Sequence, residues 1–148
     1  NNLLSKEIKA LIIDVDGTLI AGKRPILSND IRDWILNSKK YFYVYLFSNN
    51  PSWTRINTLA KQLDLEFTSS GSKPSRKKLQ RVLDKIPFPS NKIAIIGDRI
   101  FTDILVGNRL GMYTILVDSV DYYGNRVEKN TFQFIERKFA KIISGEFA

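Results

Sequence analysis

The fold of this protein is decided by residues 11–19, Leu-Ile-Ile-Asp-Val-Asp-Gly-Thr-Leu, in which an apolar run leads directly into two carboxylates. The run over 11–13 predicts a buried strand, and Gly17 predicts a sharp turn where that strand ends. Because side chains alternate along a strand, Asp14 and Asp16 are expected to project to the same side. Both carboxylates would then lie at the carboxyl end of the strand, the edge at which open α/β sheets bind ligands.

Two simpler interpretations of this stretch are open at this point. The strand could run into a solvated, aspartate-rich turn that binds nothing. A calcium loop is disfavoured, because such a loop takes oxygen ligands over about a dozen residues and ends in a glutamate. Here the apolar Leu19 and Ile20 follow the aspartates instead.

Length and composition indicate one globular domain that covers residues 1–148. With 43% hydrophobic and 26% charged residues, the chain has the balance of a folded, soluble protein. It contains no apolar run of the ~18 residues that a membrane span requires, and residues 1–10 lack the apolar region of a signal peptide. We therefore expect a cytoplasmic protein, soluble or peripheral at a membrane. A targeting segment ahead of Asn1 and the oligomeric state are left open.

The absence of cysteine and histidine limits the chemistry. It excludes disulfides, thiol nucleophiles, the usual zinc sites and histidine acid–base catalysis. Carboxylates, lysine, hydroxyls, amides and a hard cation remain. The net charge of +8 favours anionic partners, namely a phosphorylated substrate, nucleic acid or an acidic membrane surface.

Strand and helix patterns alternate through the rest of the chain. Apolar or β-rich runs predict further strands at 41–47, 66–68, 93–96 and 113–117. Helical periodicity predicts a helix in each interval between strands and one after the last strand. Their signals are the Ser28 cap with the apolar face Ile31, Trp34 and Ile35, the Asn50-Pro51 start, the stretch from Lys73-Pro74 to Ile86, residues 102–110, and a stripe of Phe132, Ile135, Phe139 and Ile142. This alternation predicts a doubly wound, Rossmann-like α/β domain with a five-stranded parallel sheet and helices on both faces.

Three of the predicted strands end in polar motifs, which are Asp14-x-Asp16, Ser48-Asn49 and Gly97-Asp98. In a parallel sheet all three motifs lie at the same edge. Each has a structural alternative when it is taken alone, because Ser48-Asn49-Asn50 or Asp98 can simply cap the helix that follows. Lys73, likewise, can be one exposed lysine among many.

Taken in order, these motifs resemble the four-motif signature of the haloacid dehalogenase (HAD) superfamily. The matching residues, over roughly 8–118, are Asp14-Val15-Asp16-Gly17-Thr18, Ser48, Lys73, and Gly97-Asp98 with Asp103 five residues on. Within the superfamily the chain is more similar to the YqeG-like phosphatases of subfamily III A, which are related to phosphatidylglycerophosphate phosphatases of mitochondria and plastids. That similarity is carried by Ser48-Asn49-Asn50, Arg55, Lys73-Pro74, residues 97–103 and Gly107-Asn108-Arg109-Leu110-Gly111. The chain departs from the branch at Gly17, where asparagine is usual, and at Arg99, where glutamine is common.

The resemblance implies a Mg²⁺-dependent phosphomonoester hydrolase that works through an aspartyl-phosphate. It makes Asp14 the nucleophile, and Asp16 the general acid and then the general base. It assigns the magnesium ligands to the Asp14 side chain, the Asp16 main-chain carbonyl and Asp98, with Asp103 supporting them from behind. The residue types suit this chemistry, because aspartate is ionised at neutral pH and Mg²⁺ prefers oxygen ligands.

The resemblance also assigns the binding of the substrate phosphate to Ser48, the amide of Asn49 and Lys73. The spacing leaves no room for a cap domain, with nine residues between Thr18 and Ser28. An open site favours a bulky phosphomonoester, and the resemblance points to phosphatidylglycerophosphate, an anionic phospholipid at a membrane surface. Nucleic-acid 3′-phosphates, sugar phosphates and phosphoproteins are the alternatives.

The excess of basic residues also has a simpler explanation. The run from Arg76 to Lys85 predicts a solvated helix face, with docking to an anionic surface as the second interpretation. The last helix, which carries Lys129, Arg137, Lys138 and Lys141, is expected to pack on the sheet, with a membrane-surface role as its alternative. A catalytically idle domain that binds an acidic partner such as RNA is the other class of hypothesis. It is disfavoured because the motif residues are all present, and because the aromatic residues lie in predicted core strands.

Overall fold

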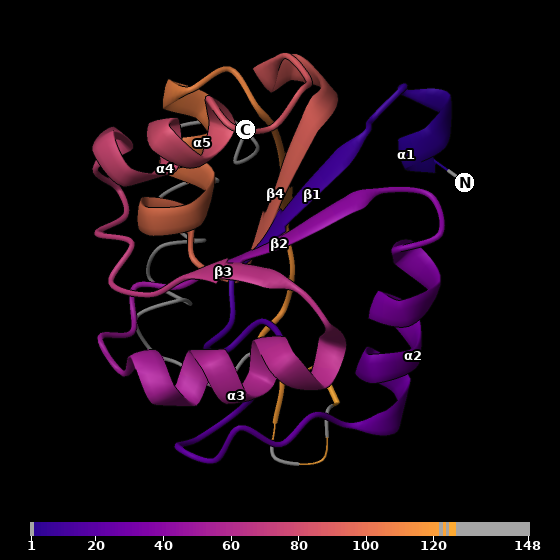
Figure 1. Ribbon diagram of the computed structural model, residues 1–148, viewed down its shortest axis with the longest axis vertical. Coiled ribbons are helices and arrows are strands. Elements are labelled where there is room, and N and C mark those ends of the chain that lie inside the picture. Colours follow the sequence, from indigo (N-terminus) through magenta and orange to yellow (C-terminus); the bar gives the residue numbers. More distant parts are fainter. Residues whose placement is uncertain (1, 122, 124, 127–148) are drawn as a thin grey trace, which may run out of the picture.

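The computed structural model describes residues 2–121, 123, 125 and 126, and its centre is a five-stranded parallel sheet (Figure 1). The strands follow the spatial order β3-β2-β1-β4-β5. Their bounds are β1 Ala10–Ile13, β2 Tyr43–Phe47, β3 Glu66–Thr68, β4 Ile93–Gly97 and β5 Tyr113–Leu116. The predicted α/β class, strand number and parallel pairing are therefore confirmed.

Helices cover both faces of the sheet, as expected for strands buried on both sides. Their bounds are α1 Asn2–Ser5, α2 Asn29–Ser38, α3 Trp53–Leu63, α4 Arg76–Leu83 and α5 Leu105–Arg109, with a 3₁₀ turn at Ser90–Lys92 and a π-helical turn at Ile100–Ile104. One buried cluster joins the sheet to α2 and α3 through residues such as Ile35 and Leu59. A second cluster joins the other face to α4 and α5 through residues such as Leu79 and Val106, and Figure 1 shows these two helices together.

Three helix boundaries differ from the predicted ones, each for a local reason. Helix α3 starts after Ser52, whose hydroxyl accepts the Arg55 N–H at 3.4 Å, while Asn50 accepts the Ser52 N–H at 2.8 Å in a turn ahead of the helix. Helix α4 starts only at Arg76, so Lys73 lies in the loop before it. The helix predicted over 102–110 begins earlier, because the π-helical turn runs directly into α5.

Two further predictions concern the apolar faces of helices. Ile31 and Ile35 of the predicted apolar face of α2 are buried, and Trp34 lines a cavity together with Ile31 although it is 45% exposed. The predicted last helix, with its Phe132 to Ile142 stripe, lies outside the described residues. None of the described helices is both long and apolar enough to cross a membrane.

The sheet order determines where the polar motifs meet. Strand β1 lies between β2 and β4, with Ile13 level with Leu46 on one side and Ile96 on the other. The chain builds β2 and β3 on one side of β1 and then crosses to build β4 and β5 on the other. This reversal between β1 and β4 is the switch point at which doubly wound sheets bind ligands. In the described part of the chain, β1 is joined to β2, and β2 to β3, by loops and a single helix. Neither connection contains a cap domain.

Candidate active site

The centre of the site is an ion pair between Asp14 and Lys73. Asp14 directly follows β1, and its N–H donates to the Ile96 carbonyl at 2.9 Å, which fixes it beside β4. The Lys73 ammonium donates to Asp14 Oδ1 at 2.7 Å, to Asp103 Oδ1 at 2.5 Å and to the Phe47 carbonyl at 3.1 Å. Lys73 is only 6% exposed, so the interpretation of an ordinary surface lysine is wrong.

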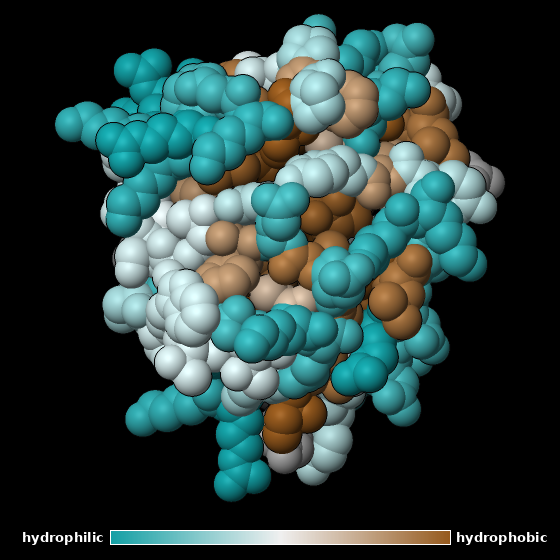
Figure 2. Space-filling view, in the orientation of Figure 1, coloured by the Kyte–Doolittle hydropathy of each residue, from teal (hydrophilic) through white to brown (hydrophobic). Residues whose placement is uncertain are grey.

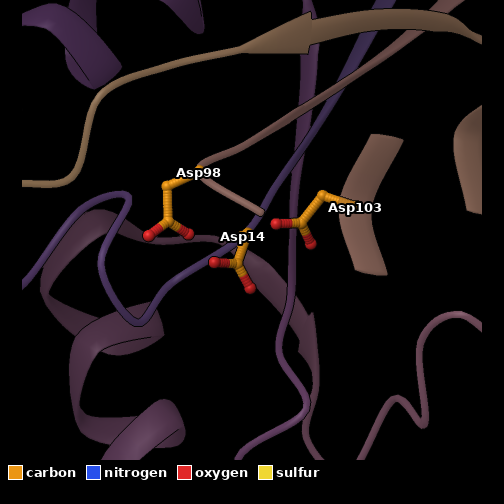
Figure 3. Close-up of side chains that lie close together, drawn as sticks. All are labelled: Asp14, Asp98 and Asp103. Carbon is orange, nitrogen blue, oxygen red and sulfur yellow. The ribbon is translucent and has the colours of Figure 1, made fainter. Parts of the chain in front are cut away.

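Two carboxylates contact this ammonium group, and a third completes their cluster. Asp14, Asp98 and Asp103 are all buried, and each offers one oxygen atom within 4.8 Å of the other two. Figure 3 shows the side chains pointing toward one another from the end of β1, the end of β4 and the π-helical turn. Asp103 thus belongs to the same buried cluster as Asp14 and Asp98.

Hydroxyl and amide groups hold the carboxylates in place. The Thr18 hydroxyl lies 3.1 Å from Asp14 Oδ2 and 3.3 Å from Asp98 Oδ1, so it bridges the two. The Ser119 hydroxyl donates to Asp98 Oδ2 at 2.9 Å, and the Arg99 N–H donates to Asp103 Oδ2 at 3.2 Å. These contacts restrict the rotation of the carboxylates and orient their remaining oxygens.

The electrostatics of the cluster favour a bound cation. Burial raises the pKa of Asp14 to about 6, against the opposing charge of Lys73. Burial also raises the pKa values of Asp98 and Asp103. One ammonium cannot compensate three buried carboxylates, and burying an uncompensated charge is costly. An all-oxygen donor set with surplus negative charge fits a divalent cation such as Mg²⁺.

Lys73 itself stays charged in this environment. Burial lowers its pKa, but the charges of Asp14 and Asp103 outweigh that effect, so that the pKa of Lys73 is raised overall. A permanently charged ammonium group in contact with Asp14 suits the binding of a phosphate oxygen.

Asp16 belongs to a separate part of the site. Its carboxylate forms an ion pair with Arg55 of α3 and accepts a hydrogen bond from the Ser48 hydroxyl at 3.3 Å. The Asp16 side chain is 40% exposed, whereas that of Asp14 is 9% exposed. The two aspartates of the first motif thus have different partners and different access to solvent.

The end of β2 connects the two halves of the site. The Asn49 side chain donates to the Lys73 carbonyl at 3.0 Å and accepts the Lys73 N–H at 2.7 Å, which holds the loop before α4 against β2. Ser48 is buried, and its hydroxyl accepts the Asn50 N–H at 3.0 Å. The helix that follows is capped by Ser52, so capping does not explain Ser48.

Gly17 allows the first motif to approach β4. It has φ +83°, and a Cβ atom there would lie 2.4 Å from Asp98 Oδ2. A side chain at this position would therefore displace a carboxylate of the cluster. Sequence reasoning placed Gly17 in a turn but did not detect this contact. It also missed Ser119, for which no motif gave a signal, and it gave no role to Arg55.

The comparisons with known proteins agree with this geometry. The family described as HAD-hydrolase-like matches residues 71–134. Probable phosphatase YqeG of Bacillus subtilis (strain 168) is 27% identical over 143 residues, which span 92% of this chain and 83% of that protein. Phosphatidylglycerophosphate phosphatase 1, chloroplastic/mitochondrial, of Arabidopsis thaliana is 29% identical over 125 residues, which span 78% of this chain and 36% of that protein.

Solved structures show the same fold. NagD from E. coli K-12 superposes with a TM-score of 0.60 at 15% identity, covering 74% of this chain and 87% of that one. The HAD-hydrolase YfnB from Bacillus subtilis, in a magnesium-bound crystal, superposes with a TM-score of 0.56 at 20% identity, covering 81% and 56%. The resemblance to HAD hydrolases and to YqeG-like phosphatases is thus confirmed.

Proposed function

We propose that this chain, a HAD-like phosphatase with YqeG-like relatives, hydrolyses phosphomonoesters through a phosphoaspartate formed on Asp14. The observation that carries the proposal is the Asp14 carboxylate, which lies at the switch point of the sheet beside the Lys73 ammonium. In the first step an Asp14 oxygen attacks phosphorus, and the bond from phosphorus to the leaving alcohol breaks. In the second step water attacks the phosphoaspartate, which releases phosphate and restores the carboxylate.

The cation site would be formed by Asp14 and Asp98, with the main-chain carbonyl of Asp16 as a further ligand. Asp103 supports this site through its contact with Lys73. A bound Mg²⁺ would offset the repulsion between the phosphate dianion and the Asp14 carboxylate.

Asp16 would transfer the protons. In the first step it protonates the departing ester oxygen, which leaves as the alcohol, and in the second it accepts a proton from the attacking water. Two observations support this role, which are the exposure of its carboxylate and the two partners that hold it, Ser48 and Arg55.

The phosphate would be held by Lys73, Ser48 and the Asn49 main-chain amide. Lys73 supplies the positive charge, and Ser48 lies within hydrogen-bonding distance of Asp16, so a phosphate bound there would lie between the two aspartates. The Asn49 side chain is already committed to Lys73, which leaves its backbone amide for this purpose.

The first test is Asp14→Asn, which keeps the volume of the side chain and removes the nucleophile. We expect no turnover of p-nitrophenyl phosphate with Mg²⁺, and an unchanged circular dichroism spectrum. Steady-state hydrolysis by the variant above that of a mock purification would contradict the assignment of Asp14. A wild-type protein that hydrolyses none of a broad panel of phosphomonoesters would instead support an idle binding domain.

For the substrate we propose phosphatidylglycerophosphate or a similar anionic phosphomonoester presented at a membrane surface. The name of the Arabidopsis relative, the lack of a cap among the described residues and the net charge of +8 support it. Figure 2 shows hydrophilic side chains gathered over α4, where Arg76, Lys77 and Arg81 are exposed, as is Lys85 just after the helix. An acidic bilayer attracts such residues with about 1 kcal/mol each near its surface.

The substrate proposal is tested by comparing kcat/KM for phosphatidylglycerophosphate in mixed micelles with that for glycerol 3-phosphate, a sugar phosphate and a DNA 3′-phosphate. We expect a preference for the lipid of at least tenfold, about 1.4 kcal/mol of transition-state discrimination. Equal efficiencies would remove the lipid assignment and leave the phosphatase activity in place.

A further inference from the structure

We propose that Arg55 is a positioning residue, which holds the Asp16 carboxylate and the loop after it in the arrangement needed for proton transfer to the leaving alcohol. This inference rests on the proposed acid–base role of Asp16. It assigns a function to a residue of α3 that the scheme above names only as a partner of Asp16.

The Arg55 guanidinium contacts three acceptors in the segment that follows β1. It forms an ion pair with Asp16, its Nε donates to the Lys23 carbonyl at 2.9 Å, and its second terminal nitrogen donates to the Gly22 carbonyl at 2.5 Å. The Arg55 side chain itself is only 11% exposed, whereas its contacts with Gly22 and Lys23 lie at the surface. One side chain thus joins the first motif to the loop beyond it.

The backbone of Arg55 is anchored at the start of a helix. It lies in the first turn of α3, and its N–H donates to the hydroxyl of Ser52, the N-cap. This helix follows β2 and the Ser48 motif, so the guanidinium is fixed relative to the same edge of the sheet as the phosphate-binding groups. A planar guanidinium can satisfy several acceptors in a fixed plane, which a lysine ammonium cannot reproduce.

Each aspartate of the first motif therefore pairs with a different basic side chain. Lys73 contacts Asp14 and shows no contact with Asp16, whereas Arg55 contacts Asp16 and shows none with Asp14. The lysine pair lies among the buried carboxylates, and the arginine pair lies on the solvent side. The two carboxylates therefore differ in partner and in access to solvent, which suits Asp14 to attack on phosphorus and Asp16 to proton transfer.

Removing the Arg55 side chain would leave another contact between α3 and this loop in place. Gln62 of α3 still donates to the Pro25 carbonyl at 3.3 Å, and the Ser52 cap is formed by a backbone N–H. The Ser48 hydroxyl would remain as a partner of Asp16, but one hydroxyl leaves the carboxylate free to rotate. The expected defect is a misplaced Asp16 on a folded protein.

The test uses the dependence of kcat/KM on the leaving group. Departure of glycerol from glycerol 3-phosphate needs a proton donor, whereas p-nitrophenolate leaves from p-nitrophenyl phosphate without one. General acid catalysis contributes about 10²–10⁴-fold. We expect Arg55→Ala to lower kcat/KM at least 100-fold on glycerol 3-phosphate and less than tenfold on p-nitrophenyl phosphate.

Two further variants and a rescue experiment make the result specific. Arg55→Lys keeps the charge but loses the planar contacts, so we expect it to lower kcat/KM on glycerol 3-phosphate at least tenfold. This variant also provides the test if Arg55→Ala does not fold. Arg32→Ala removes an exposed arginine that contacts Gln62 at 3.5 Å, and it should leave both rates unchanged. Added guanidinium should recover part of the Arg55→Ala rate on glycerol 3-phosphate.

The outcomes separate this inference from the proposed function. If Asp16→Asn discriminates between the two substrates and Arg55→Ala lowers both rates equally, Arg55 does not position Asp16 and the inference is wrong. If Asp16→Asn itself lowers both rates equally, the acid role of Asp16 fails, and the inference fails with it. Discrimination by both variants, together with guanidinium rescue, supports both statements.

Discussion

Asp14→Asn should make the cation-free protein more stable at neutral pH. Burial raises the pKa of Asp14 to about 6 from an ordinary value of 3.8. At about 1.36 kcal/mol for each pH unit, ionising this buried carboxylate costs about 3 kcal/mol of folding free energy. The variant avoids that cost. Lys73 is not left unpaired, because it keeps Asp103 at 2.5 Å and the Phe47 carbonyl at 3.1 Å.

The pH window follows from the sign of the shift. Because the folded state holds the Asp14 proton more tightly than the unfolded chain, the stabilising contribution of protonated Asp14 is fully present below about pH 4. That contribution is lost as the pH rises to about 6, and above it the whole cost is present. The advantage of Asp14→Asn over the wild type should therefore grow by about 3 kcal/mol between pH 4 and pH 7.

Urea unfolding in EDTA at several pH values measures this difference, with Asp33→Asn as the control because Asp33 is an exposed residue of α2. Mg²⁺ at 1,000 times its dissociation constant should reverse the order, since a ligand then adds about 4.1 kcal/mol and only the wild type has the complete site. A stability difference between Asp14→Asn and the wild type that stays constant from pH 4 to pH 7 would refute the reasoning. The reasoning would also be refuted if Asp14→Asn became less stable relative to the wild type as the pH rises.

Three further results are expected. Lys73→Met should abolish turnover and lower the free energy of unfolding at pH 8 by about 3–5 kcal/mol, because it leaves buried carboxylates without their ammonium partner; Lys77→Met, at an exposed position, is the control, and equal stability of the two variants would argue against the buried pair. Gly17→Ala should weaken Mg²⁺ binding and activity because its Cβ would lie 2.4 Å from Asp98 Oδ2, whereas Gly22→Ala has a similar positive φ but nothing within 4 Å; similar losses of Mg²⁺ affinity in both would point to backbone strain alone. EDTA should stop hydrolysis and Mg²⁺ restore it, and full activity of metal-stripped protein would rule out a cation-dependent mechanism.

Local sequence signals determined the order of strands and helices and the edge at which the motifs meet. The apolar runs of β1 and β4 and the aromatic run of β2 need only the side chains within each segment to form buried strands. Parallel pairing then places the residues that follow each strand at one edge, whatever their distance in the chain. For this reason the sequence alone assigns Asp14, Ser48 and Asp98 to one site.

Helix starts were predicted less well, because several polar residues compete for the cap. Asn50 and Ser52 both precede α3, and only the turn that the backbone adopts decides that Ser52 caps the helix. The same holds for Lys73-Pro74, which reads as a helix start although Lys73 turns inward and α4 begins after Ser75.

The partners of each charged group were decided by the tertiary structure alone. Asp16 and Arg55 are 39 residues apart in the chain, and Lys73 and Asp14 are 59 apart. Contacts over such distances depend on how helices pack on the sheet, which no periodicity records. Packing brought Asp103 into the same buried cluster as Asp14 and turned Asp16 toward solvent and Arg55. The sequence by itself therefore determined which groups gather at this edge of the sheet. Only the packing of helices on the sheet decided which basic side chain pairs with each aspartate.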